Sequence, residues 1–130
     1  MNIKKQRNFM SKLKEIQLLV AKTGVFFANC DGEYDKKEKE FIAKFILNMI
    51  HKGIDIDESL NELIDVKHSN ISIEEVVLET KEFLNSIDRE EQILTISMMK
   101  EFIERLINID GVEHEKEVEY FNKWKQEISL

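Results

Sequence analysis

The chain has 130 residues, the usual size of a single domain that buries its own hydrophobic core. It is 42% hydrophobic and 35% charged, a composition typical of globular proteins that excludes a disordered or fibrous chain. The net charge of −7 argues against nucleic-acid binding, because that binding depends on neutralising phosphates with Lys and Arg.

Apolar residues recur at spacings of three, four and seven along most of the chain, which is helical periodicity. The absence of proline favours long uninterrupted helices, and no Ser- or Gly-rich linker divides the chain. The sequence therefore predicts one all-α domain over residues 1–130. The predicted helices run from about Asn8 to Asn29, Asp35 to Gly53, Asp57 to Val66, Ser72 to Ile87, Asp88 to Asn108 and His114 to Ile128.

Local signals mark the ends of these helices. The first predicted helix carries a row of small residues that would let a neighbouring helix approach closely. An Asp-Gly pair follows the first predicted helix and another follows the fifth, and such a glycine suits the left-handed backbone that stops a helix. Three helix starts have capping-box spacing: Asp35 with Glu38, Ser72 with Glu75, and Asp88 with Glu91. The small residues are Ala21, Gly24 and Ala28.

The charge is unevenly distributed. Residues 1–24 contain six Lys or Arg against one acid, a net charge of +5, so the rest of the chain carries −12. A solvated polar helix face is the simpler interpretation of the basic segment. The alternative is peripheral contact between this basic N-terminal helix and an anionic membrane surface or an acidic partner.

Cysteine usage and hydropathy indicate the compartment. The single cysteine, Cys30, excludes an internal disulfide and is typical of a reducing environment. No uncharged run exceeds eight residues, which is too short for a membrane span and poor for a secretion signal. We therefore expect a cytoplasmic protein in which Cys30 is a small packed side chain.

One acidic stretch occurs twice in the sequence. Residues 29–40 read NCDGEYDKKEKE and residues 108–119 read NIDGVEHEKEVE, a constant offset of 79 residues. Each copy follows a long apolar helix and opens an aromatic-bearing one. Turn chemistry and the helix dipole account for the acids one at a time. They do not explain why both copies place Asp and Glu seven residues apart, as Asp31 with Glu38 and Asp110 with Glu117.

This spacing is used by sites for hard cations, because a loop carboxylate and one from the following helix can converge on one ion. In the calcium-binding EF-hand loop, Asp or Asn, Gly and Glu occupy the fifth, sixth and twelfth positions, and both copies fit there. The first position would be Phe27 in one copy and Leu106 in the other, where a ligating Asp is required. A true EF-hand is therefore not expected.

A shared site is the alternative geometry. If the two halves pack face to face, Asp31, Glu38, Asp110 and Glu117 would line one acidic pocket. A divalent cation would relieve the repulsion among four carboxylates. Oxygen ligands favour Ca²⁺ or Mg²⁺ over Zn²⁺.

The pair of Asp-Gly-x5-Glu motifs, one after the first long helix and one before the last, resembles the TerB-like domain family over nearly the whole chain. The family is named for a bacterial tellurite-resistance protein. The resemblance implies a compact pseudo-symmetric all-α bundle, here of about six to seven helices, with a metal site at Asp31, Glu38, Asp110 and Glu117. It also implies a non-catalytic role in a stress-response or membrane-associated protein assembly. The chain departs from the family pattern at Tyr34 and Glu113, two positions after each glycine.

Enzymatic chemistry is not marked in the sequence. His114-Glu115 lacks the second histidine of zinc proteases, because Val118 stands four residues on, and no Gly-rich phosphate loop is present. We expect a protein that is not an enzyme and that works through a protein partner, with the oligomeric state left open. A metal-independent interaction scaffold, whose acidic turns serve only capping and solubility, is the second hypothesis.

Overall fold

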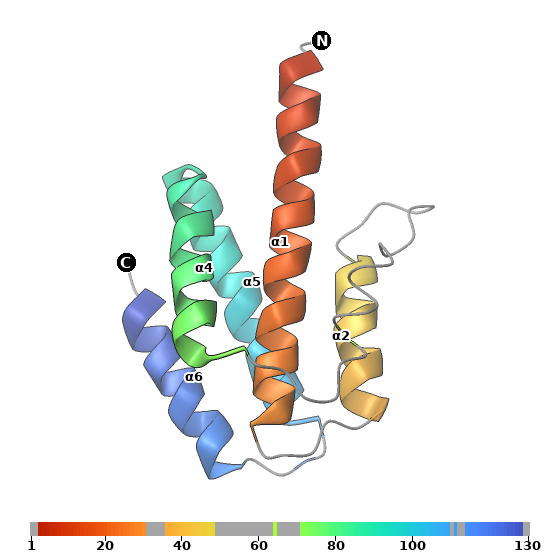
Figure 1. Cartoon of the computed structure of the whole chain (residues 1–130), viewed down its shortest axis with the longest axis vertical. Helices are drawn as coiled ribbons and strands as arrows, with labels where there is room; N and C mark the ends of the chain where they lie inside the picture. Colours follow the sequence, from red (N-terminus) through yellow and green to blue (C-terminus); the bar gives the residue numbers. More distant parts are fainter. Residues whose placement is uncertain are drawn as a thin grey trace.

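The computed structural model describes residues 3–30, 36–48, 64, 71–109, 111 and 114–128; before residue 14 the only side chain described is that of Lys12. These residues form helices and no strands, so the predicted all-α class is confirmed. Five helices are described, against the six to seven expected, and they are shown in Figure 1. They are α1 (Ile3–Asn29), α2 (Lys36–Asn48), α4 (Ile73–Asn85), α5 (Arg89–Ile107) and α6 (Glu115–Ile128).

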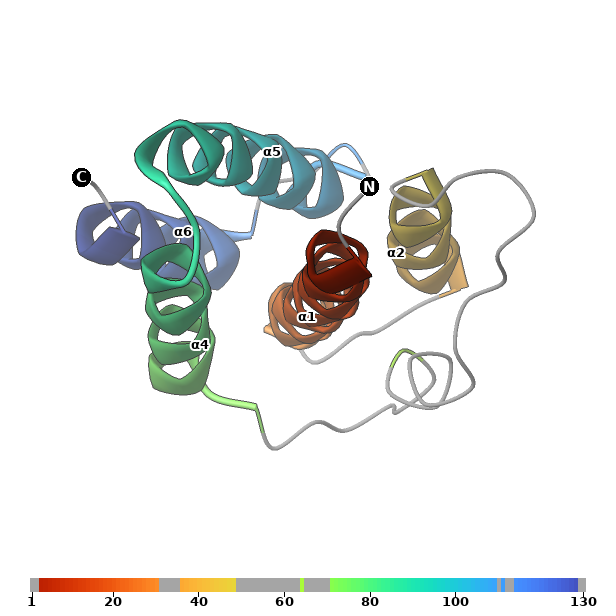
Figure 2. The ribbon, with the colours of Figure 1, turned by 90° about the horizontal axis from the view of Figure 1, so that it is seen from above.

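Helix α1 is the centre of the bundle. Viewed from above in Figure 2, it lies between α2 on one side and the group of α4, α5 and α6 on the other. It contacts α2, α4 and α5, while α6 packs against α4 and α5. Its inward face is continuous, because Val20, Val25 and Phe27 are all fully buried. Helices on both sides of α1 therefore share one hydrophobic core with it.

The small-residue row of α1 has the predicted effect at Gly24. A Cβ atom added there would lie 2.9 Å from Ile42 Cγ1 of α2 and 2.9 Å from Phe102 Cζ of α5. Both of those side chains are fully buried. Three helices thus meet at a point where only glycine leaves enough room.

Two of the predicted capping boxes have the expected hydrogen bond. The Glu75 backbone N–H donates to Ser72 Oγ at 3.1 Å, and the Glu91 backbone N–H donates to Asp88 Oδ1 at 2.8 Å. Each bond satisfies one of the helix's free N-terminal donors. Helices α4 and α5 therefore begin where local side-chain chemistry predicts.

Other boundaries differ from the prediction. Helix α1 begins at Ile3, five residues before the expected start, because Lys, Gln and Arg are good helix formers without apolar periodicity. The predicted continuation of the second helix to Gly53 lies outside the described residues. The predicted helix from Asp57 to Val66 also lies outside them except at Ile64, which is helical and buried.

Candidate functional site

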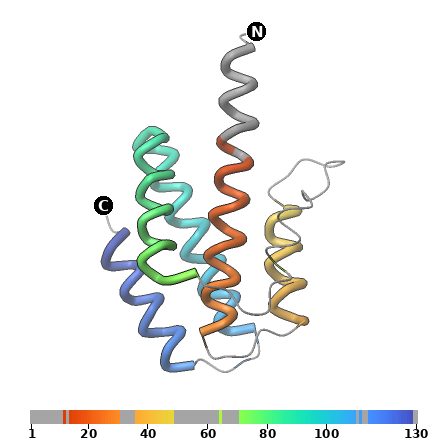
Figure 3. Tube along the Cα trace, viewed as in Figure 1, coloured from red at the N-terminus to blue at the C-terminus, as the bar shows by residue number. Residues whose placement is uncertain are grey.

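The two acidic motifs flank the same end of the bundle. Helices α1 and α5 end there and helices α2 and α6 begin there, as the lower part of Figure 1 and the trace in Figure 3 show. Helix α2 spans residues 36–48, and the offset of 79 carries these onto residues 115–127 of α6. The repeat in the sequence is therefore also a repeat of helix boundaries.

The ends of α1 and α5 repeat bond by bond. Asn29 Nδ2 donates to the Val25 carbonyl at 2.8 Å, and Asn108 Nδ2 donates to the Glu104 carbonyl at 2.8 Å. The backbone N–H of the next residue donates to a carbonyl three residues back at 3.3 Å in both copies, from residue 30 to 27 and from 109 to 106. The Asn that opens each motif thus bonds back to a carbonyl near the C-terminal end of the helix before it.

In the second motif the glycine adopts the expected left-handed conformation. Gly111 has φ +78°, and its N–H donates to the Asn108 carbonyl at 3.0 Å. A side chain would be strained at this φ. Its counterpart, Gly32, lies outside the described residues.

The two motifs pack across each other. Phe26 of α1 contacts Tyr120 of α6 edge-on, with ring centroids 5.1 Å apart, and the Arg105 guanidinium of α5 lies 5.4 Å from the Phe41 ring centroid of α2. The offset of 79 converts one pair into the other. Each motif's helix therefore contacts the helix that precedes the other motif.

Two acids of the motifs are buried at equivalent positions. The exposed fractions are 7% for Glu38 and 3% for Glu117. No other Asp or Glu among the described residues is buried, and Glu40 and Glu119, two residues further on, are exposed. The structure thus separates the predicted ligands Glu38 and Glu117 from the solvent-facing acids of the same helices.

Helical spacing carried the signal for this burial. Glu38 stands one turn before the buried Ile42, and Glu117 stands one turn before the buried Phe121. Both glutamates occupy the third position of their helices, where the helix dipole favours negative charge. Each of the two residues has at least one interaction within the structure.

The other two predicted ligands, Asp31 and Asp110, lie outside the described residues. In the described part of the chain, no three His, Cys, Asp or Glu side chains gather closely enough to hold a metal ion. The structure therefore places half of the predicted ligand set, and the predicted cation site keeps its status as a hypothesis.

The remaining candidate groups have ordinary surroundings. Cys30 is half-buried, packs against the core and donates from Sγ to the Phe26 carbonyl at 3.3 Å, as expected of a packed side chain. His114 is half-buried and has a partner. His51 and His68 lie outside the described residues.

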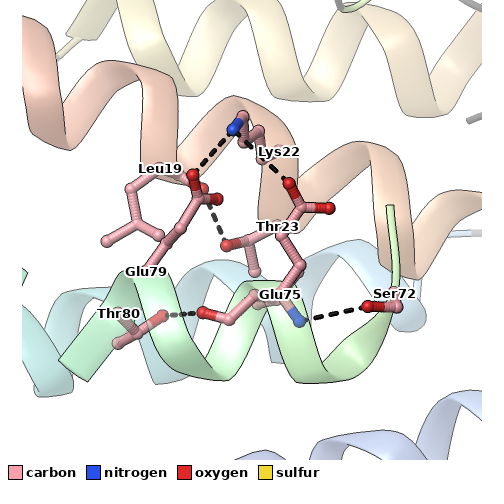
Figure 4. A network of polar contacts seen from close by, with 8 residues as sticks. Leu19, Lys22, Thr23, Ser72, Glu75, Glu79 and Thr80 are labelled. Carbon is pink, nitrogen blue, oxygen red and sulfur yellow. Dashed lines mark hydrogen bonds and ion pairs between the residues drawn. The ribbon is translucent and has the colours of Figure 1, made fainter. Parts of the chain in front are cut away.

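A polar connection between α1 and α4 was not predicted. Lys22 Nζ lies 2.7 Å from Glu79 Oε1 and 3.8 Å from Glu75 Oε1, and Figure 4 shows the lysine reaching from α1 between these two carboxylates of α4. Beside it, Thr23 and Thr80 are fully buried. The hydroxyl of each donates a 2.7 Å hydrogen bond to the backbone carbonyl four residues earlier in its own helix. The sequence feature that could have indicated this connection is the position of Lys22 within an otherwise mostly apolar helical segment.

The same two helices border a cleft of about 330 Å³. Leucines and a phenylalanine line it together with charged residues from both helices. Its lining is Lys12, Glu15, Leu18, Leu19 and Lys22 of α1, with Glu79, Glu82, Phe83 and Ser86 at α4. The cleft is distinct from the end of the bundle where the acidic motifs lie, because its α4 lining begins in the middle of that helix and continues to the C-cap.

Comparison with known protein families, with curated proteins and with solved structures finds no match to this chain. Among the described helices, none combines the length and the apolar character needed to cross a membrane.

Proposed function

We propose that the protein is a non-catalytic, TerB-like helical module that binds a divalent cation between its two Asp-Gly-x5-Glu motifs. The paired burial of Glu38 and Glu117 is the observation that carries this proposal. Both are the third residues of helices that begin at the motif turns, so they offer oxygen ligands of the kind that hard cations prefer. The same acid is buried in both copies of the motif, while its neighbours are exposed. Solubility does not explain a buried acid, so we infer that both copies bury it for the same functional reason.

The packing of the motifs supports a single shared site. The matched contacts of Phe26 with Tyr120 and of Arg105 with Phe41 support an arrangement in which two halves are related by an approximate twofold rotation. In such an arrangement Asp31 and Glu38 supply one half of the ligand set, and Asp110 and Glu117 supply the other. Carboxylate oxygens favour Ca²⁺ or Mg²⁺ over Zn²⁺.

Thermal unfolding of chelated protein tests the proposal. Adding Ca²⁺ or Mg²⁺ at one hundred times its dissociation constant stabilises the folded state by about 2.7 kcal/mol, a rise in Tm on the order of 10 °C for a domain of this size. Replacing Glu38 and Glu117 together by Gln removes the rise, measured against that variant's own chelated Tm. Replacing Asp31 and Asp110 by Asn has the same effect.

The matched control lies within the same motifs. Glu40 and Glu119 are equivalent to each other, exposed, and two residues from the proposed ligands. Replacing both by Gln removes the same charge and leaves the cation-dependent rise intact. The proposal fails if none of Ca²⁺, Mg²⁺ and Zn²⁺ shifts the Tm, or if the control pair matters as much as Glu38 and Glu117.

A metal-independent interaction scaffold is the second candidate. Glu38 and Glu117 are each the third residue of a helix, the position from which a Glu reaches back to the N-cap backbone in a capping box. If capping is their whole role, each Gln substitution costs little, because Gln can replace Glu at this position of a capping box, and the cost is the same with or without cations. Equal losses in chelator and in Ca²⁺ would support the scaffold.

The cellular role follows from the resemblance to the TerB-like family. We propose that the module acts without catalysis in a stress-response or membrane-associated protein assembly, in the cytoplasm. Crosslinking in cells exposed to oxidative metal stress, with the Glu38 and Glu117 double variant as comparison, would test whether a protein partner depends on the cation site.

A further inference from the structure

The two longest stretches without a charged residue, each of eight residues, lie in different surroundings. Thr23–Cys30 forms the end of α1, and most of its side chains are buried in the core. Gln92–Met99 lies in the first half of α5, where Ile93 is 54% and Leu94 67% exposed. The absence of charge is ordinary in a core. On an exposed helix surface it is characteristic of the central part of a protein contact.

One side of α5 is free of the other described helices. In Figure 2 this helix forms an edge of the bundle, with α1, α4 and α6 all on the same side of it. Residues at intervals of three, four and three lie on one face of a helix. Four exposed residues of α5 have this spacing and are called the α5 face below: Glu90, Ile93, Ser97 and Lys100. The α5 face therefore has an uncharged centre, with an acid at one end and a base at the other.

The two charges of the α5 face are not used within the chain. Neither Glu90 nor Lys100 has an ion pair or a side-chain hydrogen bond in the part of the chain that the structure describes. The acids of α4 that face α1 differ in this respect, because Glu79 is paired with Lys22 at 2.7 Å. Both charges of the α5 face are therefore available to a binding partner.

We propose that the α5 face is the contact surface for a second copy of the chain, in a symmetric dimer whose two α5 helices pack antiparallel. A twofold contact requires one surface that complements itself. Antiparallel pairing centred on Thr95 places Glu90 opposite Lys100 of the partner subunit. It also places Ile93 opposite Ser97 of the partner subunit, whose small side chain leaves room for the isoleucine. Leu94 flanks this apolar centre in both copies.

The order of the residues distinguishes this arrangement from others. Parallel pairing of α5 would place Glu90 against Glu90 and Lys100 against Lys100, which are repulsive pairs. A helix from another protein would have to bring a matching base and acid of its own, whereas a second copy carries both at the required spacing. Alternating steps of three and four residues are also the pattern by which two helices pack along a seam.

The size of the contact indicates its strength. The α5 face extends over ten residues, about 15 Å of helix, which places it at the small end of specific interfaces. We therefore expect a reversible dimer. The proposal does not depend on the cation site, because the acidic motif of this half follows the C-terminal end of α5 and the α5 face lies in its first half and middle.

Sedimentation equilibrium of the full chain measures the oligomeric state directly. Protein concentrations from about 10 µM to about 1 mM cover the range expected for a small interface. In about 0.1 M salt, where complementary charges remain effective over about 10 Å, we expect a monomer in equilibrium with a dimer. A chain that is monomeric over the whole range overturns the proposal. So does an open series of larger assemblies, because a twofold contact closes at two subunits.

Exchanging the charges tests the antiparallel pairing. Glu90→Lys and Lys100→Glu each raise the dimer dissociation constant about tenfold, because like charges then face each other at two symmetric places. The two substitutions combined restore a value within about threefold of the original, since opposite charges face each other again. Glu115→Lys, an equal change in the first turn of α6, controls for the helix dipole and has no effect on the dimer. Additive losses in the combined variant contradict the pairing.

A matched pair of apolar substitutions locates the contact. Ile93→Gln raises the dimer dissociation constant at least about tenfold, whereas Leu78→Gln does not, although Leu78 on α4 is 56% exposed and therefore comparably accessible. A dimer that tolerates Ile93→Gln, or that both substitutions weaken equally, contradicts the proposal. Circular dichroism confirms that each variant remains folded.

Discussion

The Phe26 and Tyr120 rings meet edge-on, with their centroids 5.1 Å apart, and so join the last turns of α1 to the first turns of α6. The equivalent contact in the other direction is that of Arg105 with Phe41, which joins α5 to α2. These contacts hold the two acidic motifs against each other's supporting helices. The candidate site therefore depends on tertiary packing between segments about 80 residues apart, whatever it binds.

A double-mutant cycle on Phe26 and Tyr120 tests this connection. We expect Phe26→Ala and Tyr120→Ala to be coupled by about 0.5–1.5 kcal/mol, as is usual for an edge-on aromatic pair. Urea unfolding of the four proteins gives the coupling. The comparison pair, Phe26 with the distant Phe83 of α4, should show additive losses; strict additivity for Phe26 with Tyr120 would mean that the contact contributes only burial.

Replacing Gly24 by Ala should destabilise the fold. The new methyl group would meet Ile42 and Phe102 at 2.9 Å, and overpacking of this kind costs about 1–3 kcal/mol. The gain in helix propensity, about 1 kcal/mol, offsets only part of that cost. Denaturant titration should show a net loss, whereas Ser97→Ala, on an exposed position of α5, should show a small gain. Stabilisation by Gly24→Ala would contradict the close approach of the three helices.

Gly111 should tolerate Asn better than Ala. A Cβ atom added to this residue would meet no other atom within 4 Å, so space is not the constraint, but φ is +78°. The left-handed conformation costs an L-residue on the order of 1–2 kcal/mol, and Asn adopts it more readily than Ala. Thermal unfolding should rank the variants in the order Gly, Asn, Ala. Equal stability of Asn and Ala would mean that the turn rearranges.

Lys22 should contribute more to stability than an exposed lysine in a similar pair. Lys22→Met leaves Glu79 partly buried without its cation, and we expect a loss of about 1–3 kcal/mol. Adding Glu79→Gln to that variant should recover part of the loss, because it removes the unpaired charge. Lys81→Met breaks the exposed pair with Glu127 and should cost less than about 1 kcal/mol. Equal losses for the two lysines would contradict the special position of Lys22.

Glu74 gives a pH-dependent test at the start of α4. Hydrogen bonding to the backbone in the first turn lowers the pKa of this carboxyl, and the Lys123 ammonium at 3.4 Å lowers it further. A lowered pKa means that the ionised form stabilises the fold above the ordinary pKa and that this contribution is lost as pH falls through the lowered value. An NMR titration should show the pKa of Glu74 rising in the Lys123→Met variant. No change would assign the shift to the helix start alone.

The sequence predicted the helices well where local chemistry sets their ends. Ser72 and Asp88 cap their helices by accepting a hydrogen bond from the backbone N–H three positions on, and Gly111 closes the turn after α5 with its left-handed backbone. The start of α1 was missed because a polar helix segment has no apolar periodicity to mark it. For the candidate site, the repeated spacing singled out Glu38 and Glu117, which the structure buries. Their role as ligands, like that of Asp31 and Asp110, remains a prediction.

By itself, then, the sequence determined the all-α class, most helix ends and the repetition of the acidic motif, because these follow from interactions within a few residues. Only the tertiary structure decided that Glu38 and Glu117 are buried while Glu40 and Glu119 face solvent. It also decided that Lys22 pairs with Glu79, which is 57 residues away in the sequence. Burial and long-range pairing depend on which helix covers which face. That choice is made by packing the whole core at once.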